Sequence, residues 1–303
     1  LSKVRTVALR RRPSKVGLSL LGRAPARGRS FRAFEAALPR LLAADEFRAL
    51  ADAIAGAVRR RRTVLWMIGA HVIKTGLSPV LLELMRRRAL TALATNGAGA
   101  IHDFELAANG ATSEDVAAGL KHGSFGMARE TGAFFARALH RRPREGFGRA
   151  TGLAIADERL PHRRLSVLHE CAQRGIPATV HVAIGTDIVH QQPGASGEDI
   201  GRASLEDFRR MCEVVASLEG GVVVNVGSAV ILPEVFLKAL TVARNLGHRV
   251  RRFTAANLDM IQHYRPRLNV VERPTALGGR RIVLTGHHEL LVPMLAQAVL
   301  ERL

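Results

Sequence analysis

The sequence predicts an α/β fold, a Rossmann-like open parallel sheet with helices on both faces. Three observations lead to this prediction. Short apolar runs recur along the chain with room for a helix between them, several runs are continuously apolar as buried parallel strands are, and the stretches between them carry helix start signals. A chain of 303 residues is long enough to bury a large core without covalent cross-links.

Seven apolar runs are candidate strands. In chain order they are 63–68, 89–95, 178–184, 222–226, 249–254, 268–271 and 281–285. Helices between them are expected to open at four start signals, which are the segments 78–79, 112–115, 204–207 and 233–234. Strand, glycine-containing turn and helix repeated in this way indicate βαβ units with right-handed crossovers.

The remaining segments complete the expected organisation. A helix over about 38–62 precedes the first strand, and the long gap 96–177 holds helices at about 125–140 and 163–174. We expect residues 110–175 to form a helical cap over one sheet edge. Residues 31–303 then form a single domain, and residues 1–30 form a basic, disordered arm.

The charge balance is strongly positive, with 45 Lys and Arg against 26 Asp and Glu and a formal net charge of +19. Forty of the basic residues are Arg, a bias that codon composition alone can produce. The arm carries nine of the 45 and no acid, which leaves +10 on the rest of the chain. Few aromatic residues accompany the runs 59–62 and 86–88, although base stacking requires them. We therefore do not expect nucleic acid as a partner.

The two cysteines, Cys171 and Cys212, lie far apart and form no CxxC motif. This excludes a disulfide framework and a thiolate zinc site, and both residues are expected to pack inside helices. No apolar run approaches the ~20 residues of a membrane span. We expect a reduced, cytoplasmic protein with no metal site.

Small and polar residues follow six of the predicted strands. Ligands bind open parallel sheets at the carboxyl ends of the strands, where backbone amides face a crevice. The candidate ligand contacts at these turns include Thr75, Gly76, Thr95, Asn96, Gly97, Gly227, Ser228, Thr254 and Gly286. Together they favour a nucleotide or dinucleotide over the alternative that such turns use glycine whatever they bind. The usual dinucleotide fingerprint is absent, because His102 stands where its third glycine belongs.

Two carboxylates and two histidines are candidate catalytic residues. His102 and Asp103 begin a helix after the second strand and could transfer protons and orient a ligand; the alternative is a helix cap beside a solvent-facing histidine. Asp187 follows the third strand and could bind a cationic amine or a ribose hydroxyl, or could simply stabilise its turn. His287 and His288 begin the last helix about 100° apart, so only one of them can face the crevice. His288 is the proton-transfer candidate.

Lys74 is the only lysine beside a strand end. It could form a Schiff base or contact a phosphate, or it could be an ordinary solvated residue.

Segment 69–116 resembles the NAD-binding half of the deoxyhypusine synthase-like superfamily. It also resembles the NAD-binding domain of archaeal-type ornithine cyclodeaminases, a likeness carried by Lys74-Thr75-Gly76, Asn96-Gly97-Ala98 and His102-Asp103. Segments 222–240, 251–257 and 283–299 continue the likeness in the same order. The resemblance implies NAD contacts at His71, Val72, Thr95, Asn96, Gly97, Asp103, Asp187, Gly227, Thr254 and His287.

The resemblance also implies an activity. It indicates an NAD-dependent homo-oligomer, a dimer or tetramer, that oxidises a C–N bond of an amine or amino acid transiently to an imine. One departure concerns the chemistry: deoxyhypusine synthase uses an imine-forming lysine before its last strand, and this chain has no lysine after Lys238. Arginine cannot replace it, because imine formation requires a neutral amine. Aminoalkyl transfer, ornithine-type deamination and a non-catalytic nucleotide-binding or regulatory role therefore all remain open.

Overall fold

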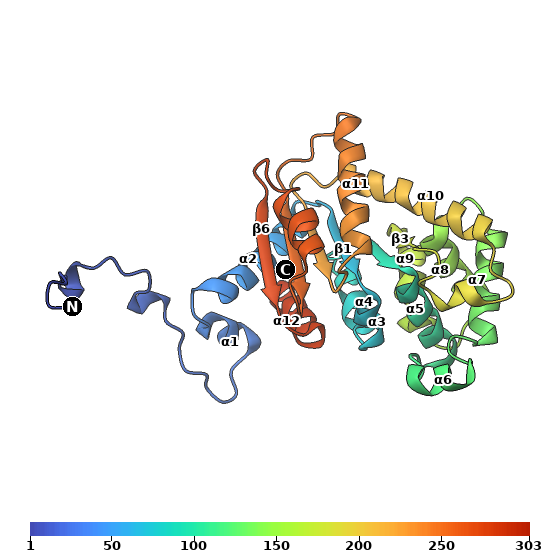
Figure 1. The fold of residues 1–303 in the computed structure, drawn as a ribbon, viewed down its shortest axis with the longest axis horizontal. Coiled ribbons are helices and arrows are strands. Elements are labelled where there is room, and N and C mark those ends of the chain that lie inside the picture. Colours follow the sequence, from blue (N-terminus) through green and yellow to red (C-terminus); the bar gives the residue numbers. More distant parts are fainter.

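A single sheet of six parallel strands organises the computed structural model, which describes residues 1–303 (Figure 1). The strands are β1 (Val64–Ile68), β2 (Ala92–Asn96), β3 (Ala178–His181), β4 (Val222–Val226), β5 (Thr254–Asp259) and β6 (Arg280–Thr285). Their order in the sheet is β3-β2-β1-β4-β5-β6. The order reverses between β1 and β4, as in doubly wound dinucleotide-binding folds. The predicted Rossmann-like α/β fold is confirmed.

Helices cover both faces of the sheet. They are α1 (Phe31–Ala37), α2 (Leu42–Arg59), α3 (Ala70–Lys74), α4 (Ser78–Arg86), α5 (Gly97–Asn109), α6 (Val116–His122), α7 (Arg129–Arg141), α8 (Gly146–Asp157), α9 (Val167–Arg174), α10 (Gly197–Ala216), α11 (Ile231–Asn245) and α12 (His288–Leu300). Helices α2, α4 and α12 pack on one face, and α10 and α11 on the other. Helices α7, α8 and α9 lie toward the β3 end of the sheet (Figure 1). No helix has both the length and the apolar composition needed to cross a membrane.

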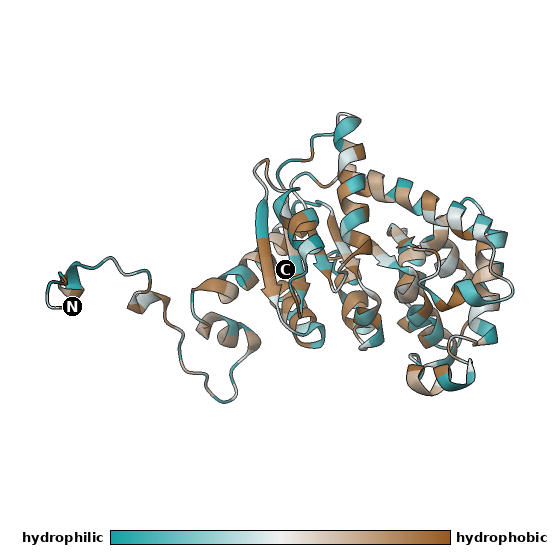
Figure 2. Cartoon of the chain, in the orientation of Figure 1, coloured by the Kyte–Doolittle hydropathy of each residue, from teal (hydrophilic) through white to brown (hydrophobic).

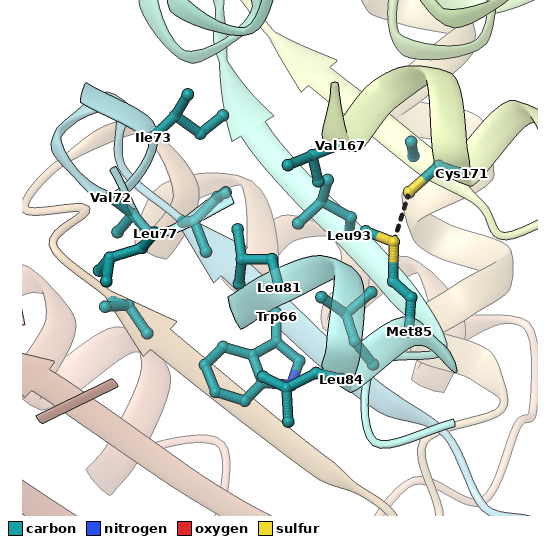
Figure 3. Close-up of a cluster of buried hydrophobic side chains, with 14 of the residues drawn as sticks. Trp66, Val72, Ile73, Leu77, Leu81, Leu84, Met85, Leu93, Val167 and Cys171 are labelled. Atoms are coloured by element: carbon teal, nitrogen blue, oxygen red, sulfur yellow. Dashed lines mark hydrogen bonds between the residues drawn. The ribbon is translucent and has the colours of Figure 1, made fainter. Parts of the chain in front are cut away.

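The central strand β1 is buried on both faces because its side chains alternate between two cores. Trp66 points into the larger core, where its indole N–H donates to the Ala89 carbonyl at 2.9 Å (Figure 3). Leu65 and Met67 point into the smaller core under α10 and α11. Cys171 packs in the larger core, with its sulfur 3.9 Å from that of Met85.

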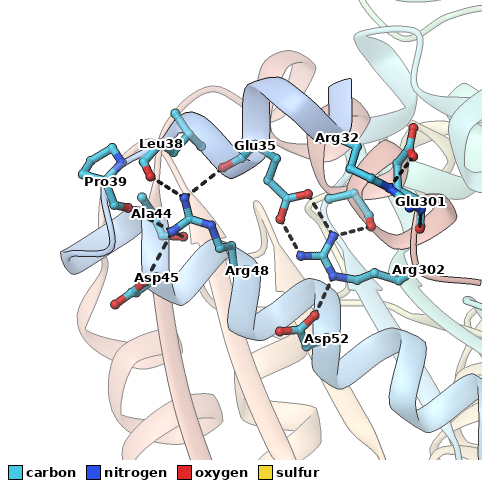
Figure 4. A network of polar contacts seen from close by, with 11 residues as sticks. Arg32, Glu35, Leu38, Pro39, Ala44, Asp45, Arg48, Asp52, Glu301 and Arg302 are labelled. Carbon is cyan, nitrogen blue, oxygen red and sulfur yellow. Dashed lines mark hydrogen bonds and ion pairs between the residues drawn. The ribbon is translucent and has the colours of Figure 1, made fainter. Parts of the chain in front are cut away.

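The two ends of the folded body are joined by ion pairs (Figure 4). Arg302, beyond α12, pairs with Glu35 of α1 and with Asp52 of α2, at 2.6 Å from the latter. Residues 1–30 precede this junction, extend away from the body in Figure 1 and contain no buried residue.

Two of the seven predicted strands are wrong. Segment 268–271 lies in a π-helical turn, Pro266–Glu272, and segment 249–254 only leads into β5. The real strand, TAANLD, contains polar residues that hydropathy cannot assign to a buried strand. They are buried because they bond to one another across the sheet, as Asn257 does with Asn225. Helix α10 also begins at Gly197 rather than at Ser204.

Candidate functional site

The ends of β1 and β4 meet at the point where the strand order reverses. The amide of Gly69 donates to the Val226 carbonyl at 2.8 Å. A Cβ atom on Gly69 would lie 2.1 Å from the Gly227 carbonyl oxygen, and Gly227 itself has a left-handed φ of +65°. Only glycine allows this approach and this conformation, so the two turns form a tight floor to the crevice.

His288, the first residue of α12, lies over this floor. A Cβ atom on Gly227 would come within 2.6 Å of its ring. The side chain is only 2% exposed, and neither ring nitrogen has a hydrogen-bond partner. Burial lowers the pKa of His288, the charge of His71 lowers it further, and Asp259 opposes both effects. The ring is therefore a neutral proton acceptor near pH 7.

Two further side chains complete what we call the His288 cluster, which consists of His71, Asp259 and His288. Asp259 ends β5, and its Oδ1 lies 3.7 Å from His288 Nε2. His71 of α3 is exposed, and its ring meets that of His288 edge-on with the centroids 5.7 Å apart. A buried histidine is thus flanked by a carboxylate on one side and by a solvent-facing histidine on the other, an arrangement suited to proton transfer.

A ladder of amide side chains joins the strands beside Asp259. Asn225 Nδ2 donates to Asn257 Oδ1 at 2.7 Å, and Asn257 Nδ2 donates to Gln262 Oε1 at 2.7 Å. Gln262 Nε2 in turn donates to the Leu284 carbonyl at 3.1 Å. The ladder links β4, β5 and β6 at the edge where the cluster stands.

His102 lies on the neighbouring helix α5. Its Nδ1 is 2.7 Å from the Thr112 hydroxyl, which donates its proton to Glu105. Because the hydroxyl has a single proton, His102 must donate from Nδ1, and Nε2 remains free to accept. Partial burial and the charges of Lys74 and His71 lower the pKa of His102. The structure thus brings the predicted residues His71, His102 and His288 to one region.

Asp103 has a different place from the one predicted. Its side chain is fully buried and caps α9, accepting from the Ser166 hydroxyl at 2.6 Å and from the amides of Val167 and Leu168 at 2.7 and 3.1 Å. Burial, opposed by these hydrogen bonds, raises its pKa to about 6. Helical periodicity explains the error, since Asp103 points about 100° away from His102 and toward the core. The expected catalytic role is corrected to a structural one.

Asp187 covers the first turn of α5. A Cβ atom on Gly97 would lie 2.0 Å from Asp187 Oδ2, which is buried and has no hydrogen-bond partner. Burial raises the pKa of Asp187, whereas His190 and the Ala98 amide lower it. Asp187 and His190 also form a capping box for the turn Ile188–Gln191. The carboxylate is therefore a free acceptor held against the helix N-terminus.

The other predicted contacts divide into three groups. The side chains of Val72, Thr95 and Asn96 are engaged internally: Val72 lies in the core, Thr95 donates to the Ile68 carbonyl at 3.0 Å, and Asn96 caps α5 by accepting from the Gly99 amide at 2.9 Å. At the edge of the site, Gly76 and His287 are exposed, whereas Thr75 and Gly286 are half-buried; the Thr75 hydroxyl donates to the His71 carbonyl at 2.8 Å. Ser228, beside Gly227, accepts from the Leu232 amide at 3.3 Å.

Thr254 is misplaced, because it begins β5 instead of ending it and so lies at the opposite edge of the sheet. The residue that the site uses from this strand is Asp259, five positions later. The sequence contained one signal for it, because an acidic residue between Leu258 and Met260 is a polar strand end of the kind sought elsewhere. No cluster of three His, Cys, Asp or Glu side chains could hold a metal ion.

Comparisons with known proteins bear on the fold. No protein-family model and no curated protein sequence matches the chain. A LOR/SDH protein of Methanococcus maripaludis S2 superposes with a TM-score of 0.56 at 14% identity, over 86% of this chain and 70% of that one. A protein of Entamoeba histolytica assigned as a deoxyhypusine synthase superposes with a TM-score of 0.52 at 11% identity, over 92% of this chain and 96% of that one.

AgrE, in a ternary complex with ornithine and NAD+, gives a TM-score of 0.54 at 15% identity over 85% of this chain. The chain spans 33% of the length of AgrE and 33% of that of ArgZ, a cyanobacterial arginine dihydrolase. The likeness that the sequence indicated is thus found in three dimensions as a fold that this chain shares with these proteins.

Proposed function

We propose that the chain binds NAD at the carboxyl edge of its sheet and acts as an NAD-dependent enzyme on an amine or amino-acid substrate. The observation that carries this proposal is His288, a buried and unpartnered histidine at the topological switch point with Asp259 beside it. Buried polar groups without partners are rare in folded proteins and concentrate where a ligand completes them. The fold similarity to AgrE, whose complex contains ornithine and NAD+, supports the same substrate class.

The edge fits a dinucleotide in three respects. Gly69 and Gly227 leave the floor free of side chains, which permits close approach of a ligand. The amides of Ser228, Ala229 and Val230 donate to no acceptor within the protein and precede the N-terminus of α11, a place suited to phosphate oxygens. Asp187 Oδ2 offers an acceptor to a ribose hydroxyl or a substrate ammonium.

The residues of the chain then have distinct roles. NAD, when bound, supplies a hydride acceptor that allows a C–N carbon to be oxidised to an imine and later reduced again. His288 accepts a proton from the substrate amine, because its lowered pKa keeps it neutral. Asp259 stabilises the resulting imidazolium, and His71 passes the proton to solvent. Asp187 holds the cationic end of the substrate.

The second candidate is a non-catalytic dinucleotide-binding protein of the same fold. The observation that favours it is the absence of any lysine beyond Lys238, since the imine-forming lysine of deoxyhypusine synthase has no counterpart. Lys74 is exposed beside His102 at the same edge. Aminoalkyl transfer therefore requires a different nucleophile from the protein. Deamination of an ornithine-like substrate requires no nucleophile from the protein.

The test begins with the native protein and its bound nucleotide. Denaturation of the purified protein is expected to release NAD, which mass spectrometry detects. Calorimetry of the protein freed of nucleotide is expected to show NAD binding. Turnover is then followed with ornithine and with spermidine. Bound NAD without turnover of either substrate supports the non-catalytic candidate, and absence of NAD binding refutes both.

A matched pair of variants assigns the chemistry. His288→Ala is expected to lower kcat at least 100-fold, the size of a typical acid–base contribution. His248→Ala changes an exposed histidine that precedes β5, at the opposite edge of the sheet, and is expected to leave kcat within about twofold. Equal losses in the two variants contradict the role of His288. Sedimentation of the same protein tests the homo-oligomer that we also propose.

A further inference from the structure

The parallel topology separates the two ends of every strand, and charge is distributed unequally between them. The segments that lead into the strands are 59–63, 86–91, 174–177, 217–221, 246–253 and 273–281. They contain fourteen arginines and a single acidic residue, Glu219. The segments that follow the strands, 69–77, 97–99, 182–196, 227–230, 260–265 and 286–287, contain two basic residues and one acidic residue. We call the arginine-rich side the amino edge.

Composition cannot explain this separation. A codon bias toward arginine acts at every position, whereas here the arginines gather at the side of the sheet opposite to the candidate site. Helix C-termini favour a cation nearby by about 0.3–1 kcal/mol, which accounts for one basic residue per helix end and not for runs of four and three. Figure 2 shows the same separation along β6, which is hydrophilic at its amino end and hydrophobic beyond it.

The arginines of the amino edge are available to a ligand. All fourteen are exposed. Only three form ion pairs, Arg86 and Arg87 with Glu83 and Arg174 with Glu170. The other eleven have no carboxylate partner, and like charges held this close together repel one another in the absence of a counter-charge.

Two adjoining hollows open on this edge below β1, β2 and β3. The smaller, of about 240 Å³, is lined by Arg61, Arg62 and Arg88 together with Thr63 and Thr91. Arg61 and Arg88 end their helices with left-handed φ angles of +52° and +60°. The larger hollow, of about 570 Å³, continues past Pro177 and Ser217 and has a mixed lining, in which Arg149 and Arg210 are balanced by Glu145 and Glu213. The smaller hollow is therefore the one that is lined by unpaired arginines.

The extent of the positive edge indicates the kind of anion. Strands lie about 4.8 Å apart, so six strands give an edge of about 24 Å, with arginines before every strand except β4. One small anion would neutralise a single hollow, whereas a chain of phosphates can neutralise the whole edge. The only aromatic residue in the six segments is Phe253, which is buried. Contacts are therefore made to phosphates and not by stacking on bases.

Composition alone argued against nucleic acid as a partner, but the placement of the arginines along one edge of the sheet is a separate observation. From it we propose that the amino edge binds nucleic acid through its phosphate backbone, without sequence preference. A phosphodiester backbone can place one phosphate in the smaller hollow and its neighbours along the arginines of the edge, and arginine pairs with phosphate through two parallel hydrogen bonds. A bilayer surface is flat and does not enter hollows, and the edge offers it only Leu246 and Leu277 as exposed apolar side chains. This function is separate from the chemistry proposed for the carboxyl edge.

Three triple variants of the full chain test the proposal. The edge variant is R61E/R62E/R88E. The arm variant is R10E/R11E/R12E. The control variant, R129E/R141E/R164E, makes the same change of charge with exposed, unpaired arginines of the helical region. Binding to a labelled 20-residue oligothymidylate and to a duplex of mixed sequence is measured by fluorescence anisotropy from 50 to 300 mM KCl.

The wild-type protein is expected to bind both probes with a steep salt dependence. The edge variant is expected to bind at least tenfold more weakly and to lose about 2 from the slope of log K against log salt, because about 0.7 is lost per phosphate contact on a single strand. The arm and control variants are expected to bind within threefold of wild type. Circular dichroism confirms that each variant is folded.

Four results overturn the proposal. They are no binding by the wild-type protein, an equal loss in the arm variant, an equal loss in the control variant, and binding to phosphatidylserine vesicles without binding to either nucleic acid probe. The last result assigns the edge to an anionic membrane surface. None of these measurements depends on NAD. The test of the amino edge is therefore independent of the proposed enzymatic function.

Discussion

Replacement of Asp103 separates a structural role from a catalytic one. Asp103→Ala removes an acceptor from three buried donors, the Ser166 hydroxyl and the amides of Val167 and Leu168. Each buried donor left without a partner costs about 1–3 kcal/mol. The Ser166 hydroxyl can reorient, so two amides carry most of the cost. We expect the free energy of unfolding to fall by about 4 kcal/mol.

Asp103→Asn is the graded control for this prediction. Its remaining oxygen can face the Ser166 hydroxyl and the Leu168 amide, and its NH2 group then opposes the Val167 amide alone. One unsatisfied donor gives an expected loss of about 2 kcal/mol. Both variants, measured by urea denaturation and by NAD titration of the folded fraction, are expected to bind NAD as the wild type does. A stable Asp103→Ala protein that fails to bind NAD would refute the structural assignment.

The same residue predicts a pH dependence. Its folded pKa of about 6 lies above the unfolded value of 3.8, so the folded state binds the proton more tightly. Its contribution to stability is therefore full below about pH 4 and is lost as the pH rises through 6. The stability difference between wild type and Asp103→Asn is expected to grow in favour of wild type between pH 6 and pH 4. A difference that is constant over this range contradicts the raised pKa.

Three further predictions concern the carboxyl edge. Gly227→Ala places a methyl group 2.6 Å from His288 and strains a φ of +65°. The control, Gly247→Ala, strains a φ of +87° but its methyl group meets nothing within 4 Å. In urea denaturation we expect Gly227→Ala to lower the free energy of unfolding by at least about 2 kcal/mol more than the control does. Asp259→Asn removes the charge that raises the pKa of His288, so the acidic limb of the kcat/KM profile is expected to move to lower pH; movement to higher pH contradicts the pairing. Burial raises the pKa of Asp187, so we expect KM for a cationic substrate to rise as the pH falls through this raised pKa. Asp187→Asn is expected to abolish the rise, and an unchanged profile in the variant assigns it to another group.

The order of strands and helices was predictable because burial on both faces leaves a plain mark on the sequence. β1 is continuously apolar and β4 is apolar except for Asn225. Helix α4 begins at its start signal, and α6 begins directly after the signal 112–115. The position of β5 was not predictable, because two of its residues are both polar and buried. Asn257 is bonded to Asn225, 32 residues away in the sequence, and Asp259 stands at the end of the strand. Hydropathy measures a residue without its partners, so it favoured the valines of 268–271, which pack in a π-helical turn instead.

The site residues follow the same division. Residues named for their place at a strand end, such as Gly97, Gly227 and His288, do stand at the carboxyl edge, because parallel topology fixes that position. Direction was harder to predict than position. Asp103 and His102 are neighbours in sequence, and yet one caps α9 from inside the core and the other faces Thr112 at the surface of α5.

The missing third glycine and the position of Asp187 have one explanation. In the usual dinucleotide fingerprint, phosphates bind the N-terminus of the helix after a glycine-rich turn, and the third glycine allows that helix to pack closely. Here the equivalent first turn of α5 is covered by a carboxylate that a phosphate would face at close range, with repulsion in place of attraction. We therefore infer that the phosphates of the proposed NAD bind the free amides before α11, which leaves α5 to a hydroxyl or ammonium donor. On this proposal no phosphate binds at α5, so His102 can occupy the position of the third glycine, where it lies within reach of the charges of His71 and Lys74.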